Sequence, residues 1–324
     1  MERLRQDDPP YIGPYATLAR LDADSTERTV PERRYLARTA DGGRTVLVCL
    51  PRAGADPSRW AIEAEWARRL SVARFLNVAE VGGTAGSPWY AAPYTPVLPL
   101  PAVLGAYGGP LPENLVRGLG AALAEGTAAA HAQGVTHAGL SPAAVLVTPG
   151  GPLLTCFGAV RAAAPDGTPR TGLPGLDPGC LAAEEAAGGP PGPLGDVFAL
   201  GAVLAYASTG HTVPEQGELP PGLRRLVAAC LARDPGDRPS AQELLRELAA
   251  PGARTGPTEV SPLPGARTGP TEVSPLPGAT VLDHAAPLPL PGRVVAALAH
   301  QSARLLGMEL AAAQESFAPT GKAH

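Results

Sequence analysis

Apolar and polar residues alternate in the first part of the chain and recur at helical spacing in the second. Strand-like runs are predicted within residues 15–50, near 77–82 and near 88–95. An Asp-Gly-Gly turn at 41–43 interrupts the first of these. One helix is predicted at 58–71, with Ser58 as its N-cap.

Beyond residue 95 the pattern becomes mainly helical. Helices are predicted at 111–132, 194–209, 221–232 and 239–249. Two short apolar runs, AVLV and LLTCF, lie after the first helix and are joined by a Pro-Gly-Gly-Pro turn. Strands followed by helices are typical of an α+β protein with segregated lobes. We predict a first lobe at 13–95 and a second at 96–249, connected by YAAPYTP and preceded by an extension at 1–12.

The last quarter of the chain has a different composition. The unit PGARTGPTEVSPL occurs twice, at 251–263 and 264–276, within a Pro- and Gly-rich stretch at 250–292. Such a stretch buries too little apolar surface to offset its ordering entropy, so we predict a disordered linker. Helical spacing returns at 293–317, before a tail at 318–324. The apolar stripe of this amphipathic helix is predicted to contain Val294, Leu298, Leu305, Leu306 and Phe317.

Two roles are open for the helix at 293–317. It either caps the preceding domain or forms a partner-binding or dimerising surface. Its polar face has no cluster of Lys and Arg, which disfavours membrane binding.

Composition narrows the choice of partner and compartment. Charged residues make up 17% of the chain and the net charge is −4, which disfavours a nucleic-acid partner. No apolar run is long enough to span a membrane, and the N-terminal residues do not resemble a secretory signal. The four cysteines form no CxxC pair, so we expect reduced thiols and a cytoplasmic protein. They are Cys49, Cys156, Cys180 and Cys230.

A single lysine, Lys322, is present in the chain. Any chemistry that requires a lysine side chain is therefore excluded for residues 1–321.

An ordered series of motifs runs from the first strands to the last helix of the two lobes. The segments are VLVCL at 46–50, HAQGVTHAGLSPAAVLVT at 131–148, CFG at 156–158, AAE at 182–184, DVFALG at 196–201 and DRPSAQELL at 237–245. Their order resembles that of bacterial Ser/Thr protein kinases over residues 13–249. The resemblance implies a bilobal protein-kinase-like fold, with a small β-rich N-lobe and a larger helical C-lobe.

Positions that support this fold in the family are retained. They are Glu63, His137, Phe157, Gly158, Glu184, Asp196 and Arg238. The resemblance implies that Glu184 and Arg238 form a buried ion pair. It leaves open whether Glu63 or Glu65 is the helix glutamate that pairs with the family's lysine, and it assigns scaffold roles to His131 and His137.

Positions that handle ATP and the substrate hydroxyl in the family have all changed. Cys49 stands at the lysine of the third strand, Gly139 at the catalytic Asp, Ser141 at the loop Lys, Ala144 at the Asn and Cys156 at the metal-binding Asp. Phosphoryl transfer relies on positioning and charge neutralisation, and Mg²⁺ prefers carboxylate oxygen to a thiol. The resemblance therefore implies no catalytic residue and no metal site here.

The loop that approaches phosphate in the family has lost its glycines. Asp22, Asp24 and Glu27 stand at the corresponding positions, and carboxylates repel phosphate. No cofactor is expected, and ATP and Mg²⁺ enter only if the chain is a divergent kinase or a residual ATP-binding protein.

The motifs therefore predict a pseudokinase that acts as a scaffold or regulator through protein–protein contacts. A further alternative is a phosphorylation substrate, with Thr258 and Thr271 of the repeat as acceptors. The partner would then be an active kinase or a phosphopeptide-binding protein. Cys49 and Cys156 are interpreted as small buried hydrophobic residues, with a disulfide or a soft-metal site as the other option.

Overall fold

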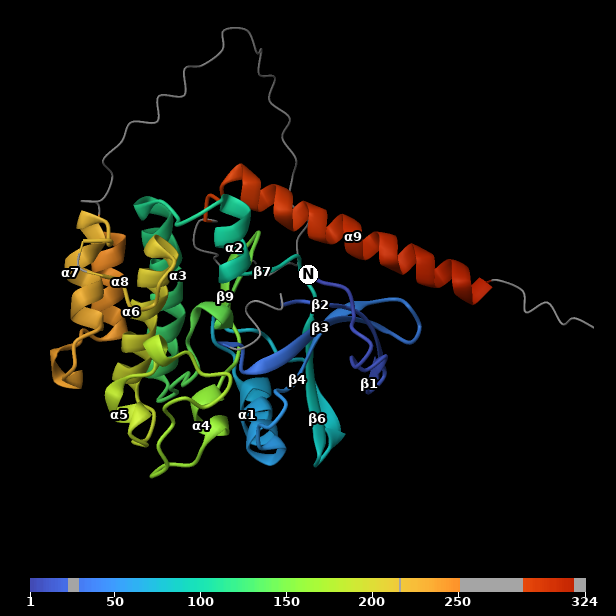
Figure 1. Cartoon of the computed structure of the whole chain (residues 1–324), viewed down its shortest axis with the longest axis horizontal. Coiled ribbons are helices and arrows are strands. Elements are labelled where there is room, and N and C mark those ends of the chain that lie inside the picture. The colour runs from blue at the N-terminus through green and yellow to red at the C-terminus, as the bar shows by residue number, and fades with distance from the viewer. Residues whose placement is uncertain (23–28, 216, 251–287, 318–324) are drawn as a thin grey trace, which may run out of the picture.

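Two lobes and one long helix make up the protein (Figure 1). The structure, a computed structural model, describes residues 1–22, 29–215, 217–250 and 288–317, with side chains as far as Met308. The smaller lobe is a sheet with one helix and the larger lobe is mainly helical, so the predicted α+β bilobal fold is confirmed. The repeat and the tail lie outside the described residues.

A six-stranded antiparallel sheet, in the order β1-β2-β3-β4-β6-β5, forms the smaller lobe. Its strands are β1 (Tyr11–Ile12), β2 (Tyr15–Arg20), β3 (Glu32–Thr39), β4 (Thr45–Pro51), β5 (Glu80–Thr84) and β6 (Ser87–Pro93). The predicted turn joins β3 to β4. There the Gly43 N–H donates to Asp41 Oδ1 at 3.0 Å, and Gly42 adopts a φ of 69°, which suits glycine.

Helix α1 (Pro57–Arg69) packs on this sheet through Trp60 and Ala64. The helix begins after Asp56, whose carboxylate accepts the N–H of Ser58 at 2.9 Å. The prediction of Ser58 as the N-cap is therefore wrong. Aspartate satisfies the free N–H groups of the first turn, and the proline that follows suits the first helical position.

Helix α3 (Glu113–Ala132) forms the centre of the larger lobe. Its Leu115, Leu119 and Leu123 recur every four residues and are buried, and α6 and α8 pack against it. The other helices of this lobe are α2 (Leu100–Tyr107), α4 (Ala159–Ala163), α5 (Ala183–Ala186), α6 (Pro193–Thr209), α7 (Pro221–Cys230) and α8 (Ala241–Ala249).

A three-stranded sheet lies where the lobes meet. It consists of β7 (Leu98–Pro99), β8 (Val145–Thr148) and β9 (Gly151–Leu154), and short 3-10 turns occur at η2 (Pro142–Ala144), η3 (Pro178–Cys180) and η4 (Pro235–Asp237). The two predicted apolar runs form β8 and β9. Leu146 of β8 shares one buried cluster with Leu21 and Leu47 of the smaller lobe, so apolar packing joins the lobes here.

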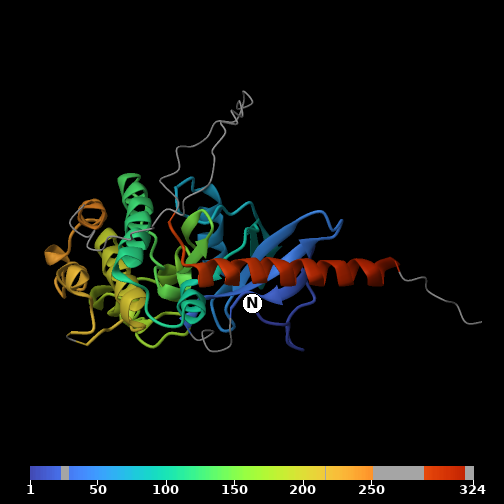
Figure 2. The same ribbon diagram turned by 90° about the horizontal axis from the view of Figure 1, so that it is seen from above.

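Helix α9 (Gly292–Phe317) runs along both lobes, from α2 to β2 (Figures 1 and 2). It begins one residue before the predicted start. Val294 and Leu298 are buried in the larger lobe's core, and Leu305 is buried in the cluster between the lobes. Leu306 is 58% exposed, so its predicted place on the buried stripe is wrong. No helix in the described ranges is long and apolar enough to cross a bilayer.

Candidate functional site

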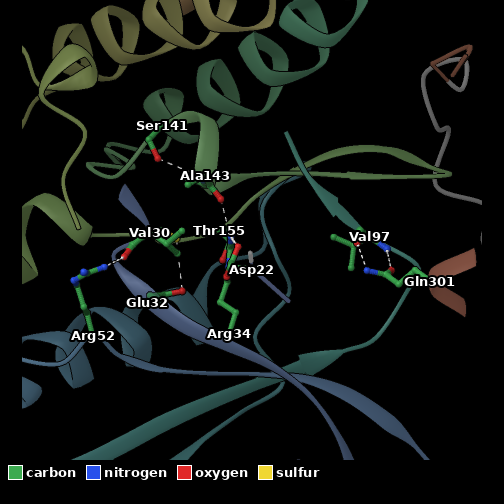
Figure 3. A network of polar contacts seen from close by, with 12 residues as sticks. Asp22, Val30, Glu32, Arg34, Arg52, Val97, Ser141, Ala143, Thr155 and Gln301 are labelled. Atoms are coloured by element: carbon green, nitrogen blue, oxygen red, sulfur yellow. Dashed lines mark hydrogen bonds and ion pairs between the residues drawn. The ribbon is translucent and has the colours of Figure 1, made fainter. Parts of the chain in front are cut away.

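The candidate site is the cleft between the lobes. From the smaller lobe, β3, β4 and α1 face it, and from the larger lobe η2, β8 and the segment after β9 face it (Figure 3). Along β3, residues 32, 34 and 36 lie on the same side of the strand, because side chains alternate between faces. Glu32, Arg34 and Leu36 are all buried, so two charged side chains enter the space between the lobes.

Arg34 forms a buried ion pair within the smaller lobe and a hydrogen bond across the cleft to the larger lobe. Arg34 Nε donates to Asp22 Oδ2 at 2.8 Å, and its Nη2 donates to the other carboxylate oxygen. The Nη1 of Arg34 donates to the backbone carbonyl of Ala143 in η2 at 2.9 Å (Figure 3). Burial acts to lower the pKa of Arg34, but the attraction of Asp22 outweighs it and the net pKa is raised.

Asp22 is therefore already paired with a cation of the same lobe, the guanidinium of Arg34. Its carboxylate neutralises Arg34 in the cleft instead of standing free at a phosphate loop. The other two predicted loop residues, Asp24 and Glu27, lie outside the described residues.

A second polar cluster surrounds Glu32. Tyr90 Oη donates to Glu32 Oε2 at 2.7 Å, and the Cys156 thiol points at the same oxygen at 3.7 Å. Tyr90 stacks on Trp60 with a centroid distance of 5.4 Å. Burial raises the pKa of Glu32, so this carboxyl favours its neutral form.

Cys49 and Cys156 both face this cluster as free thiols. Each is at most 1% exposed, and burial raises both pKa values well above the ordinary value for a thiol. A protonated thiol is neither a nucleophile nor a metal ligand. The described residues contain no group of three or more side chains that suits a metal ion. The interpretation of both cysteines as buried hydrophobic residues therefore fits the geometry better than a soft-metal site.

Glu63, and not Glu65, is the glutamate of α1 that points into the structure. Glu65 pairs at the surface with Arg68, whereas Glu63 is 9% exposed and binds Arg161 of α4. Arg161 Nη2 donates to Glu63 Oε2 at 2.7 Å and Nε lies 3.0 Å from both carboxylate oxygens. The partner of this glutamate thus comes from the segment after Gly158 and not from β4.

His137 is a packed scaffold residue. Its ring meets Phe75 and Phe157 edge-on, at centroid distances of 5.1 and 5.8 Å. The backbone N–H of His137 donates to Asp196 Oδ2 at 2.7 Å, and His131 Nε2 lies 2.9 Å from the same oxygen. Asp196 thus anchors the loop to α6. Burial lowers the pKa of His137 to about 4, so the ring is neutral at pH 7.

Gly139 has no room for a side chain. A Cβ placed on it would lie 2.1 Å from the carbonyl oxygen of Cys156. Cys156 itself has φ 61°, an uncommon conformation for a residue other than glycine. The backbone around Gly139 therefore leaves space for glycine only. The motif comparison aligns this position with the family's catalytic Asp.

The two remaining loop positions serve local structure. Ser141 Oγ accepts the N–H of Ala144 at 3.2 Å and caps the η2 turn, and both residues are buried. Further into the larger lobe, Arg238 Nη1 and Nη2 donate to the two oxygens of Glu184, at 2.6 and 3.0 Å. These two side chains lie within salt-bridge distance, as expected, but the Glu184 side chain is 35% exposed, so the pair is half-buried and not buried.

Little polar space remains in the cleft. The space beside Glu32, Trp60 and Phe157 has a volume of about 90 Å³. A larger space of about 250 Å³ is lined by Leu47, Leu146 and other residues, none of them charged. Ligand pockets usually hold ~300–1,000 Å³. The described residues at these positions do not fit Mg²⁺-ATP, because Asp22 is already paired with Arg34 and Cys156 offers the metal a thiol in place of a carboxylate.

Four functional residues were missed in the sequence. They are Glu32, Arg34, Arg161 and Gln301. The first three form buried or half-buried polar contacts between the lobes, and Gln301 binds the connection at Val97. Glu32 and Arg34 could have been recognised in the sequence, because residues two apart on a strand lie on the same face, here that of the buried Leu36. Arg161 and Gln301 could not, because their partners lie 98 and 204 residues away.

Comparison with known proteins identifies relatives among bacterial kinases. The chain is 35% identical over 271 residues to a probable serine/threonine-protein kinase, PkwA, of Thermomonospora curvata. It is 30% identical over 271 residues to the serine/threonine-protein kinase AfsK of Streptomyces coelicolor. Each match covers 77% of this chain but only 36% and 33% of the relative, so the chain spans about a third of their length.

Solved structures agree on the fold. The PknI kinase domain of M. tuberculosis matches with a TM-score of 0.55 and 21% identity, over 72% of this chain and 94% of that one. Rad53 in complex with AMP-PNP matches with a TM-score of 0.56 and 16% identity, over 72% and 64%. No protein-family model matches the sequence. Over about three quarters of its length the chain is therefore homologous to bacterial serine/threonine protein kinases, and its fold is that of a protein-kinase domain.

Proposed function

We propose that this chain is a catalytically inactive family member, a pseudokinase, that acts as a scaffold or regulator through protein–protein contacts. The observation that carries the proposal is the ion pair of Arg34 with Asp22, bonded across the cleft to Ala143. A guanidinium and a carboxylate that neutralise each other in the cleft are not available to phosphate or Mg²⁺. The neutral Cys156 thiol and the closed backbone at Gly139 support the same conclusion.

A divergent kinase or residual nucleotide binder is the second candidate. The relatives favour it, since PkwA and AfsK are named as serine/threonine-protein kinases. The uncharged space of about 250 Å³ beside Leu47 and Leu146 would suit an apolar ring, without a counter-charge for phosphates. This candidate therefore predicts that adenosine binds as well as ATP and that Mg²⁺ adds nothing.

Partner chemistry follows from the family. Kinase-like surfaces contact other proteins, so we infer a protein partner, either an active kinase or a phosphopeptide-binding protein. Thr258 and Thr271 remain proposed phosphoacceptors for such a kinase, and mapping phosphorylated residues on protein from its native cells tests them. Four cysteines without a disulfide in the structure suit a cytoplasmic setting.

Phosphoryl transfer tests the proposed inactivity. Purified full-length chain is incubated with labelled ATP, Mg²⁺ or Mn²⁺ and a general protein substrate, beside heat-denatured protein and an active kinase. We expect incorporation equal to that of the denatured sample. A rate that saturates with ATP and disappears when the chain is omitted would overturn the proposal.

A further inference from the structure

Helix α9 binds the connection between the lobes through one amide side chain. Gln301 is 3% exposed; its Oε1 accepts the Val97 N–H at 2.9 Å and its Nε2 donates to the Val97 carbonyl at 2.7 Å (Figure 3). Tyr94 Oη donates to the same Oε1 at 3.1 Å. A carboxamide carries one acceptor and two donors, so it matches both main-chain groups of a single residue.

Apolar residues on the same helix face complete the contact. Val294 and Leu298 pack into the core of the larger lobe, and Leu305 packs with Leu21 and Leu146 between the lobes. The four buried positions follow a spacing of four, three and four residues, which forms one stripe on a helix. The stripe therefore contacts the larger lobe, the connection and the smaller lobe in succession.

Two polar contacts at the edges fix the helix along its axis. Arg293 Nη1 donates to the carbonyl of Tyr107 at the end of α2, at 3.1 Å. Arg304 Nη1 donates to the carbonyl of Met1 at 3.3 Å. In the sequence, residues 251–287 separate this helix from α8.

The geometry points to a helix-binding site on the kinase-like domain. We propose that α2, residues 94–97 and β2 form a groove for an amphipathic helix with a glutamine between two apolar anchors. Residues 292–308 of this chain are its exchangeable occupant. A partner helix with the same pattern would displace α9 and uncover Val97. This inference goes beyond the proposed inactivity and does not depend on it, since no nucleotide takes part.

Peptide binding to the full-length chain tests the proposal. The probe is a fluorescent peptide of residues 288–308, titrated without nucleotide and followed by anisotropy. The Gln301→Ala/Leu305→Ala variant weakens the tethered helix, so we expect it to bind the peptide about tenfold more tightly than wild type does. Leu306→Ala is the matched control, because Leu306 is 58% exposed, and it should bind like wild type.

A second variant guards against loss of folding. Val294→Ala/Leu298→Ala weakens the other end of the stripe, with Val295→Ala, 49% exposed, as its control. Circular dichroism reports the fold of each protein. Equal peptide binding by wild type and both folded variants overturns the proposal, and so does absence of binding by both. Unfolding of both variants would also overturn it, because α9 would then be part of the core and not a ligand.

Discussion

Glu63 of α1 and Arg161 of α4 form an ion pair at the back of the cleft, with Arg161 Nη2 2.7 Å from Glu63 Oε2. The Arg161 guanidinium also lies 5.0 Å from the centre of the Phe157 ring and donates to the Thr136 carbonyl at 3.2 Å. Cys49, which the motif comparison aligns with the family's lysine, is a fully buried free thiol on β4. The glutamate of α1 is therefore held by the segment after Gly158, and α1 keeps its place without a lysine.

Removal of Arg161 should destabilise the fold. Arg161→Ala leaves Glu63, 11% exposed at its side chain, without a counter-charge. Exposed pairs contribute ~0–1 kcal/mol and broken buried pairs cost ~3–5, so we expect a loss of about 2 kcal/mol in the free energy of unfolding. Urea denaturation measures it. Arg68→Ala, which removes a surface partner of Glu65, is the control and should leave the midpoint nearly unchanged.

Gly139 should not accept a side chain. A Cβ there would meet the Cys156 carbonyl oxygen at 2.1 Å, so Gly139→Ala must move the backbone. Overpacking typically costs ~1–3 kcal/mol, and we expect a loss of about 3 kcal/mol. Gly105→Ala is the control, because a Cβ at Gly105 on α2 meets nothing within 4 Å and alanine favours the helix. Equal thermal midpoints for the two variants would contradict the packing described here.

The same contact bears on any attempt to restore catalysis. Cys49→Lys, Gly139→Asp, Ala144→Asn and Cys156→Asp together introduce the family's residues, but the new Asp at position 139 has no space in the present backbone. We expect this variant to melt below wild type and to remain inactive.

The contribution of His137 to the free energy of unfolding should fall as pH decreases from 7 to 5. Its pKa is about 4 when folded and near 6.5 when unfolded, so the unfolded state binds the proton first. The contribution is complete above pH 6.5 and falls by about 2 kcal/mol at pH 5. Glu185, whose pKa burial raises to about 7, acts in the opposite direction.

Comparison with His137→Phe separates the titration of His137 from that of Glu185. Phenylalanine keeps the edge-on packing against Phe75 and Phe157 and does not titrate. The difference in unfolding free energy between variant and wild type should therefore grow in favour of the variant as pH falls. If this difference stays constant between pH 7 and 5, folding does not lower the pKa of His137, and the burial described here is contradicted.

The sequence predicted most of the fold because its strongest patterns are local. The hairpin at 32–51, the stripe of α3 and the start of α9 all follow from spacing along one element. Helix α2 was not predicted, because LPLPAVLG contains two prolines, although Pro101 lies in the first turn, where the missing N–H costs nothing. Leu305 and Leu306 are adjacent apolar residues, and only the position of the groove decides which is buried.

The contents of the cleft were less predictable. The changed motif residues explained what the cleft lacks, but not what fills it. Arg34 meets the carbonyl of Ala143, 109 residues away, and Gln301 meets Val97, 204 residues away. Such contacts leave no periodic signal. The cytoplasmic setting, the domain bounds and the linker at 250–292 stay predictions.

Nucleotide binding to the full-length chain tests the central claim most directly. Thermal unfolding is followed with ATP up to millimolar concentration, with and without Mg²⁺, and with adenosine as a control for ring binding alone. A ligand at 100 times its dissociation constant stabilises the folded state by about 2.7 kcal/mol, which is readily seen as a shift in midpoint. We predict no shift that depends on Mg²⁺, because Arg34 and Asp22 neutralise each other and Cys156 offers no carboxylate. A saturable, Mg²⁺-dependent rise in the midpoint with ATP, absent with adenosine, would contradict the account.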